Sequence, residues 1–214
     1  MAVRLGAHDI ITTKLTFSRD IYRIFANRCL ACHSAGSAIP LTTYEETRPW
    51  AVSIKEQVLS RSMPPWGAVK GFGDLAPDHG LSQEEIMIIA AWVIGGAPQG
   101  NPALLPKQIT SSKGSATVPL KDGLVVDTRC ELKEPLQAAG VRPLAEGAVE
   151  SARIVAVLPD GRIQPLLWLY HFDPKSERTF TFRRPLDLPP KTVIESSAPL
   201  RFVIKVSNSA MAMR

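Results

Sequence analysis

The hydrophobic pattern of the chain changes its period near residue 100. Before that point apolar residues recur at the three- and four-residue spacing of amphipathic helices, and beyond residue 119 they alternate with polar residues, as in half-buried strands. The intervening residues 101–119 are rich in Pro, Ser and Thr and indicate a linker. A chain of 214 residues can hold two small domains. The pattern predicts a multidomain protein, an α domain over 1–100 (core 16–100) followed by a β domain over 120–214.

Three helices are expected in the first part. The first is capped by Ser18, the second begins near Thr43, and the third begins after Ser82 and ends at two glycines. Glu46 and Glu85 stand three residues after the second and third caps, as in a capping box.

The second part is expected to contain at least six short strands in an antiparallel β-sandwich of seven or eight. A Pro-Asp-Gly turn at 159–161 separates two of them. The predicted strands are 123–128, 152–158, 163–170, 178–183, 192–197 and 201–206.

The motif CLACH carries the strongest chemical signal. Cys29 and Cys32 alone would fit a redox dithiol, half of a zinc site or a disulfide framework. Zinc needs four ligands, but Cys130 stands alone and the remaining histidines are scattered singly. His33, directly after Cys32, completes the C-x-x-C-H signature of covalent haem attachment. The two thiols would form thioethers with the haem vinyl groups, and the imidazole would bind the iron.

A methionine is the predicted ligand on the other side of the iron. Met63 stands before two prolines that stiffen the chain, and a thioether is a soft, neutral ligand suited to an electron carrier. Met87 lies in an apolar helical pattern and is expected to be a core residue. His79, in a loop rich in Gly, Asp and Pro, is a weaker alternative ligand.

Residues 16–100 resemble the monohaem class I cytochromes c, in particular the secreted bacterial kind. The resemblance lies in FSRDI, CLACH, TYEETRPWA, R-x-MPPW and the final LSQEEIMIIAAWVIGGAP. It implies the all-helical cytochrome c fold, one haem c attached to Cys29 and Cys32, and His33 and Met63 as axial ligands.

The resemblance also implies an environment for the haem. It suggests that Pro40 presents its backbone carbonyl to the second ring nitrogen of His33 and so orients the imidazole. Trp66 and Trp50 could line the haem edge or bind a propionate, and packing is an equal alternative for both. Arg61 could pair with a propionate or be a solvated surface arginine.

The second part of the chain contains the stretches Pro159-Asp160-Gly161, Tyr170-His171-Phe172-Asp173 and Leu188-Pro189-Pro190-Lys191-Thr192. With these stretches, residues 140–205 resemble, more faintly, the C-terminal jelly roll of copper type II, ascorbate-dependent monooxygenases such as peptidylglycine hydroxylating monooxygenase. Where that family has a His-x-His copper pair, this chain has Leu144-Ala145-Glu146, and His171 is the single histidine of the half. One imidazole does not hold a catalytic copper. No copper is expected, and the domain is interpreted as a docking or interaction module.

Charge and hydropathy restrict the kinds of partner that the protein can have. Up to residue 100, nine Lys/Arg balance nine Asp/Glu, so the net charge of +5 comes from the rest of the chain. That excess could attract an acidic protein or a membrane surface, or only keep the domain in solution. No nucleic-acid motif occurs, and the longest apolar run, 86–97, is too short to span a bilayer.

Haem attachment to C-x-x-C-H takes place outside the bacterial cytoplasm, so a periplasmic or extracellular protein is expected. The N-terminus lacks the apolar core of a secretory signal, so a processed or recombinant form is expected.

Three functions are compatible with these features. The leading one is electron transfer by a six-coordinate monohaem cytochrome c that is not itself an enzyme, with the β domain docking onto a redox partner protein. The second is a copper- or haem-dependent oxidoreductase. The third is a structural or electron-relay subunit of a larger redox complex, one that could be associated with a membrane.

Overall fold

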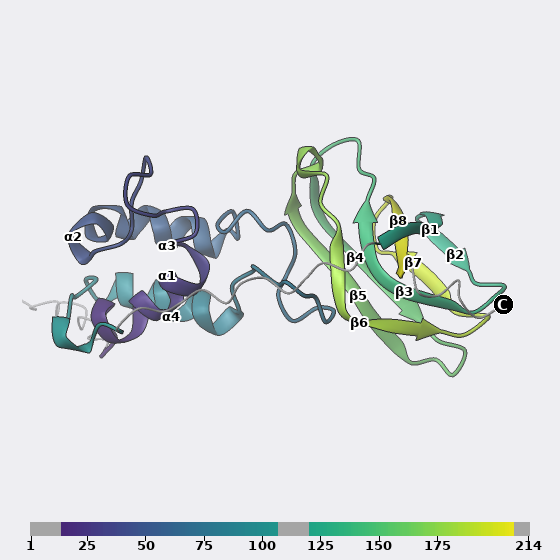
Figure 1. Ribbon diagram of the computed structural model, residues 1–214, viewed down its shortest axis with the longest axis horizontal. Helices are drawn as coiled ribbons and strands as arrows, with labels where there is room; N and C mark the ends of the chain where they lie inside the picture. Colours follow the sequence, from purple (N-terminus) through teal and green to yellow (C-terminus); the bar gives the residue numbers. More distant parts are fainter. Residues whose placement is uncertain (1–13, 107–119, 208–214) are drawn as a thin grey trace, which may run out of the picture. The chain divides into compact units, whose positions relative to one another are not determined.

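The computed structural model describes residues 14–106 and 120–207, which fall into two compact units (Figure 1). The helical unit comprises Met1–Met63 and Gln83–Ser111. The β unit comprises Pro64–Ser82 and Ser112–Arg214.

The helices of the helical unit are short, and the longest has 12 residues. They are the π-helical turn η1 (Phe17–Ile21), α1 (Tyr22–Arg28), α2 (Tyr44–Thr47), the 3₁₀ turn η2 (Arg48–Trp50), α3 (Ala51–Leu59), α4 (Gln83–Ile94) and the 3₁₀ turn η3 (Pro102–Leu104).

Local sequence signals fix the ends of these helices. The predicted capping box is confirmed at Thr43, whose hydroxyl accepts a hydrogen bond from the Glu46 N–H (3.2 Å), while the Glu46 carboxylate accepts from the Thr43 N–H (3.1 Å). Gly96, predicted to terminate the last helix, has φ +90°, a conformation that glycine adopts without steric cost. The predicted cap Ser18 is instead buried inside η1, and Thr16 takes the N-cap position.

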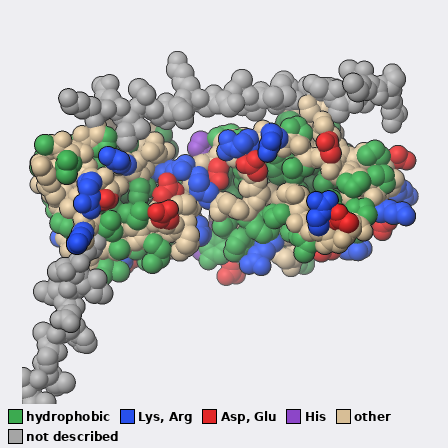
Figure 2. All heavy atoms as spheres, turned by 90° about the horizontal axis from the view of Figure 1, so that it is seen from below, with side chains coloured by type: hydrophobic (Ala, Val, Ile, Leu, Met, Phe, Trp, Pro, Cys, Tyr) green, Lys and Arg blue, Asp and Glu red, His purple; other side chains and the backbone are tan. Residues whose placement is uncertain are grey.

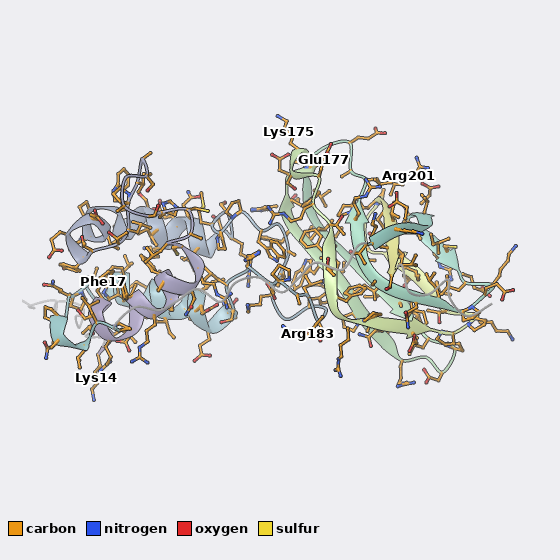
Figure 3. All side chains as sticks on the ribbon, in the orientation of Figure 1. Lys14, Phe17, Lys175, Glu177, Arg183 and Arg201 are labelled. Carbon is orange, nitrogen blue, oxygen red and sulfur yellow. The ribbon has the colours of Figure 1, made fainter. Side chains whose placement is uncertain are left out.

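The core of the helical unit is an aromatic cluster around Phe17 (Figure 3). The ring centroid of Phe17 lies 5.6 Å from that of Tyr44, 6.2 Å from that of Trp92 and 6.3 Å from that of Phe25. The indole N–H of Trp92 has a hydrogen-bond acceptor inside the unit, because it donates to the Pro98 carbonyl at 3.0 Å. Aromatic packing of this kind joins η1, α1, α2 and α4.

The β unit contains two four-stranded antiparallel sheets (Figure 1). One sheet has the strand order β1-β8-β3-β6 and the other the order β2-β7-β4-β5, which is the order of an eight-stranded jelly roll. The strands are β1 (Leu120–Asp127), β2 (Arg129–Glu131), β3 (Leu136–Pro143), β4 (Val149–Val157), β5 (Ile163–Phe172), β6 (Phe180–Leu188), β7 (Val193–Ser196) and β8 (Arg201–Ser207).

Alternation along the strands builds one apolar core from both sheets. In β4, Ala152, Ile154 and Ala156 are fully buried, and the residues between them are exposed or half-buried. The opposite sheet contributes Phe180 from β6 and Phe202 from β8, both fully buried. Members of all strands except the three-residue β2 are buried in this core, and Cys130 of β2 packs against it.

Residues 64–82 form a strap along one side of the β unit. The strap pairs first with β5: the Val69 N–H donates to the Trp168 carbonyl (2.9 Å), and the Tyr170 N–H donates to the Gly67 carbonyl (3.1 Å). β5 is the edge strand of its sheet, so the strap satisfies backbone groups that an edge would leave open.

The strap then pairs with β6, the edge strand of the other sheet. The Ala76 N–H donates to the Thr181 carbonyl (2.9 Å), and the Arg183 N–H donates to the Asp74 carbonyl (2.7 Å). A single segment therefore covers the neighbouring edges of both sheets.

The predicted fold class, an all-α cytochrome c fold followed by a jelly-roll-like sandwich, is wrong. In the part of the chain that the structure describes, ordered structure is mostly β, in two antiparallel sheets, and the few helices are short. No all-α cytochrome domain precedes a β-sandwich there. The physical reason is the strap: residues 64–82, expected inside a helical domain, form backbone pairs with β5 and β6.

The compact units accordingly differ from the predicted boundaries at 100 and 119, since the β unit includes the strap. Within the predicted linker, the structure describes 101–106, where η3 forms and Asn101 Oδ1 accepts a hydrogen bond from the Ala103 N–H. The rest of the predicted linker lies outside the described residues. All six predicted strands have a counterpart, and β2 and β3 are additional.

Candidate functional site

The CLACH motif forms one tight turn at the end of α1. The Cys29 N–H closes the helix by donating to the Phe25 carbonyl (2.8 Å). The N–H groups of Cys32 and His33 then both donate to the Cys29 carbonyl, at 3.0 and 2.9 Å. Neither cysteine is in a disulfide; Cys29 is half-buried and Cys32 is exposed. The motif therefore places two free thiols and one imidazole on five consecutive residues that form a single backbone turn.

The imidazole of His33 is fixed by a backbone carbonyl. Its Nδ1 lies 2.8 Å from the carbonyl oxygen of Ile39. Because a carbonyl can only accept, Nδ1 must carry the proton, and in the neutral ring Nε2 then has a free lone pair. No hydrogen bond to Nε2 is found among the described residues. This tautomer suits a histidine that binds a metal through Nε2.

The carbonyl that holds His33 belongs to Ile39 and not, as predicted, to Pro40. The contribution of Pro40 is indirect, because a proline restricts the residue before it to extended backbone. The Leu41 N–H donates to the His33 carbonyl at 3.1 Å and closes the loop behind the ring.

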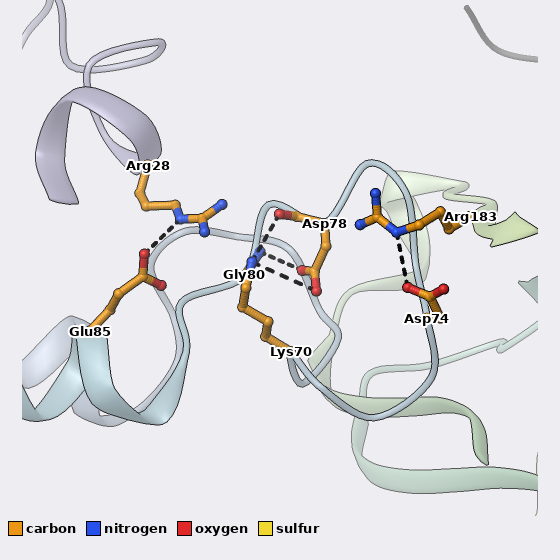
Figure 4. Close-up of polar contacts among 7 residues, drawn as sticks. All are labelled: Arg28, Lys70, Asp74, Asp78, Gly80, Glu85 and Arg183. Carbon is orange, nitrogen blue, oxygen red and sulfur yellow. Dashed lines mark hydrogen bonds and ion pairs between the residues drawn. The ribbon is translucent and has the colours of Figure 1, made fainter. Parts of the chain in front are cut away.

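An ion pair lies beside Cys29. Arg28 Nε is 3.1 Å from Glu85 Oε1 on α4, and both side chains are largely buried (Figure 4). Burial raises the pKa of the Cys29 thiol to about 12, and the Glu85 carboxylate adds to the shift. Cys29 is therefore a protonated thiol at neutral pH. The sequence did not predict this pair, because Glu85 was assigned to a capping box and 57 positions separate the two residues.

Met63 lies on the turn that ends α3. The N–H groups of Ser62 and Met63 both donate to the Gln57 carbonyl, at 2.9 and 3.2 Å, and Arg61 adopts φ +57° between them and the helix. The side chain of Met63 is 41% exposed. Arg61 Nη2 donates to Gln83 Oε1 (2.8 Å), so its guanidinium connects the turn to α4.

Met87 is not a core residue, which corrects the prediction. Its side chain is 54% exposed on α4, whose buried positions include Ile86, Ile89 and Trp92. The apolar sequence of α4 concealed its solvent-facing side, since the polar residues that would mark that side are missing after Glu85.

Trp66 is a core residue of the β unit. It is 7% exposed, and its ring centroid lies 5.2 Å from that of Phe180 and 4.9 Å from that of His79, the alternative ligand. The guanidinium of Arg178 lies 4.7 Å from the same centroid. The described atoms include no acceptor for the Trp66 indole N–H. Trp50, in the helical unit, is 43% exposed.

Leu144, Ala145 and Glu146 occupy the positions where the resembled monooxygenase family has its His-x-His copper pair. Leu144 and Glu146 line a hollow of ≈ 440 Å³ together with an Asp127–Arg201 ion pair. His171 is exposed and stacks on Tyr170, with 4.4 Å between ring centroids. Over residues 14–106 and 120–207, no group of three or more His, Cys, Asp or Glu side chains is placed to hold a metal ion.

The surface charge of the β unit is mixed. On the face drawn in Figure 2, basic and acidic side chains lie next to one another. Asp122 illustrates this, with carboxylate oxygens 2.6 Å from Lys205 Nζ and 3.4 Å from Arg142 Nη2. Among the helices in the described ranges, none has the length and apolar character needed to cross a bilayer.

No protein-family profile, no curated protein and no solved structure matches the chain. Inferences about function therefore rest on the residues and their geometry.

Proposed function

We propose that this chain attaches one haem c through Cys29 and Cys32 and serves as an electron carrier, with His33 and Met63 as axial ligands of the iron. The observation that carries the proposal is the His33 tautomer. Its Nδ1–H is committed to the Ile39 carbonyl, and its Nε2 lone pair stands within one turn of two free thiols. This donor set fits the covalent attachment of haem.

Each residue has a defined task in this proposal. The thiols of Cys29 and Cys32 would form the two thioether bonds, and the Ile39 carbonyl orients the imidazole. Met63 supplies a thioether, which favours the reduced state of the iron more than a second imidazole would. When bound, haem supplies a one-electron couple. If His33 and Met63 both held the iron, they would leave no open position for substrate, which favours a carrier over an enzyme.

The partner and the compartment follow from the same chemistry. Because such attachment occurs outside the bacterial cytoplasm, we place the protein in the periplasm or outside the cell, where it exchanges electrons with a redox partner protein. The excess of basic residues after residue 100 supports a docking role for the β unit toward an acidic partner. Membership of a larger redox complex is the main alternative, and copurification of the native protein distinguishes the two.

A haemochrome assay tests covalent attachment. The wild-type protein, expressed with the bacterial machinery for haem attachment, should retain one haem per chain after acid–acetone extraction. The variant Cys29→Ala/Cys32→Ala should retain none. Cys130→Ala is the matched control and should keep the full signal, because Cys130 lies on β2. Extraction of all haem from the wild-type protein would disprove the proposal.

Optical spectra test the role of Met63. The ferric protein should show the weak near-infrared band of a methionine–iron bond, and Met63→Ala should lose it and bind carbon monoxide in the ferrous state. Met87→Ala, which removes another exposed methionine, should leave both properties unchanged. Carbon monoxide binding to the wild-type ferrous protein would reject the six-coordinate site and favour the oxidoreductase alternative.

A further inference from the structure

Within the β unit, the strap covers only part of the edge strand β5. Its backbone hydrogen bonds reach Trp168 and Tyr170, which lie in the run LLWLYHF at 166–172. This run contains no Asp, Glu, Lys or Arg, no proline and no glycine. A short apolar segment of this kind on an open sheet edge is a template for pairing with another strand. The strap therefore lies on the part of β5 that is most prone to such pairing.

The parts of the two edge strands that the strap leaves unpaired are protected by their own residues. In β5, Pro165 stands just before the run, and β6 contains Pro185 after the residues that pair with the strap. Proline has no N–H to donate, and it is a common protection of sheet edges. β6 also carries Arg183 and Arg184, whose charges would repel those of a second β6. Only the run 166–172 has no such protection in its own sequence, so it depends on the strap.

Backbone pairing, two core residues and one close approach hold the strap on the β unit. Trp66 and Leu75 are buried in the β core. At Gly73, which has φ +83°, the strap passes so close to β5 that a Cβ atom would overlap the Leu166 carbonyl oxygen. Real Cβ atoms essentially never come closer than 3.0 Å to such an atom. A side chain at Gly73 must therefore push the strap away from β5.

We propose that the β5 edge at 166–172 is a surface that binds a second copy of this chain, and that the strap keeps it closed. Antiparallel pairing of β5 with the β5 of a second copy uses the same surface on both chains and forms a closed dimer. The run carries no charge that would repel its own copy or select a charged partner strand. This inference concerns the β unit alone and does not depend on haem attachment.

The matched pair Gly73→Val and Gly71→Val tests the proposal by analytical ultracentrifugation of the full chain. The two glycines have nearly the same φ, +83° and +85°, so a valine strains the backbone similarly at each. Nothing lies within 4 Å of a Cβ atom at Gly71. Gly73→Val should sediment as a dimer at concentrations at which the wild type and Gly71→Val are monomers. If Gly73→Val does not fold, Gly67→Ala gives the same test, because a Cβ atom there meets the movable ring of Phe172.

Hydrogen exchange shows where the copies associate. In Gly73→Val the Val69 N–H, which donates from the strap to β5, should exchange faster at every protein concentration. The Tyr170 N–H, which donates from β5 to the strap, should exchange fast in dilute solution and become protected in the dimer. The Ala156 N–H, inside the sheet, should stay protected throughout and report that the β unit is folded.

A lysine on the β5 edge tests the surface itself. Combined with Gly73→Val, Tyr170→Lys brings two like charges into the interface between the copies and should restore the monomer. Ile163→Lys is the matched control, because it adds the same charge to β5 outside the run, at a side chain 64% exposed. Combined with Gly73→Val, it should leave the dimer intact.

Each other outcome overturns the proposal. Faster exchange at Val69 without association would show that the open β5 edge does not bind a second copy. Equal association of Gly73→Val and Gly71→Val would make backbone strain the cause. A dimer that persists with Tyr170→Lys would place the contact away from the run 166–172, and open-ended aggregates would exclude the closed pairing of two β5 strands.

Discussion

The helical unit and the β unit differ in how much of their apolar surface they bury. Among the described residues, ten large hydrophobic side chains are exposed, and only Val125 and Ile163 of these belong to the β unit. The helical unit exposes the other eight: Trp50, Val52, Leu59, Met63, Met87, Ile94, Leu104 and Leu105.

This contrast shows two ways of specifying structure. The β unit encloses one core between two sheets, and its strands are defined by partners far away in sequence. The helical unit consists of helices of 4 to 12 residues, lengths that are marginal in isolation. It depends on caps, turns and the aromatic cluster around Phe17. We therefore expect the helical unit to open before the β unit. Three substitutions probe the contrast between the two units, and Thr43→Ala tests the order of opening.

The largest effect is expected for Phe180→Ala in the β core. Phe180 is fully buried between Trp66 and Phe172, with ring centroids 5.2 and 6.0 Å away. Truncation should lower the free energy of unfolding by about 3–5 kcal/mol, measured by urea denaturation of the β unit. Ile163→Ala, at a side chain 64% exposed, is the control and should change it by less than about 0.5 kcal/mol. Similar costs at the two sites would show that Phe180 is not a core residue.

A smaller effect is expected for Thr43→Ala in the helical unit. The substitution removes the acceptor for the Glu46 N–H and should cost about 1 kcal/mol. Faster hydrogen exchange at Glu46 and earlier thermal loss of helical circular dichroism are the measurements. Thr43→Ser keeps the hydroxyl and should restore most of the stability. If the alanine variant also sped up exchange throughout the β unit, the two units would not open separately.

The smallest effect is expected for Asp122→Asn on the surface of the β unit. The hydrogen bond from Lys205 lowers the pKa of the Asp122 carboxyl, with Arg142 adding to the shift. Because the unfolded chain binds this proton more tightly, the stabilisation is present above about pH 4 and is lost as the pH falls through the lowered pKa. The variant should unfold in acid with a weaker pH dependence than the wild type. An acid transition identical in both proteins would show that this carboxylate contributes nothing.

The sequence predicted the features that depend on neighbouring residues. Alternation located all six predicted strands, and the spacing of Thr43 and Glu46 located a capping box that the structure confirms. The CLACH turn is likewise local, since four backbone hydrogen bonds between Phe25 and His33 define it.

Features that depend on distant partners could not be predicted in this way. β3 was missed because Ala138, Ala139 and Gly140 have low strand propensity, and the strand forms because it lies between β6 and β8. At Gly140, a Cβ would lie 2.6 Å from the Phe180 carbonyl oxygen, so close strand packing selects a residue that is more typical of turns. The strap was misassigned for the same reason. Its sequence suggests a loop, and only β5 and β6 give it a structure.

The pairing of the strap with β5 and β6 sets an order of events during synthesis. Asp74 leaves the ribosome 109 residues before its partner Arg183. At the ordinary pace of about 5–20 residues per second, the strap waits roughly 5–20 s before the strands that it covers exist. During that interval Trp66 and Leu75 have no core in which to be buried. The part of the strap that pairs with β6 can dock only after β6 has been made, so the edge of that sheet is closed late in synthesis.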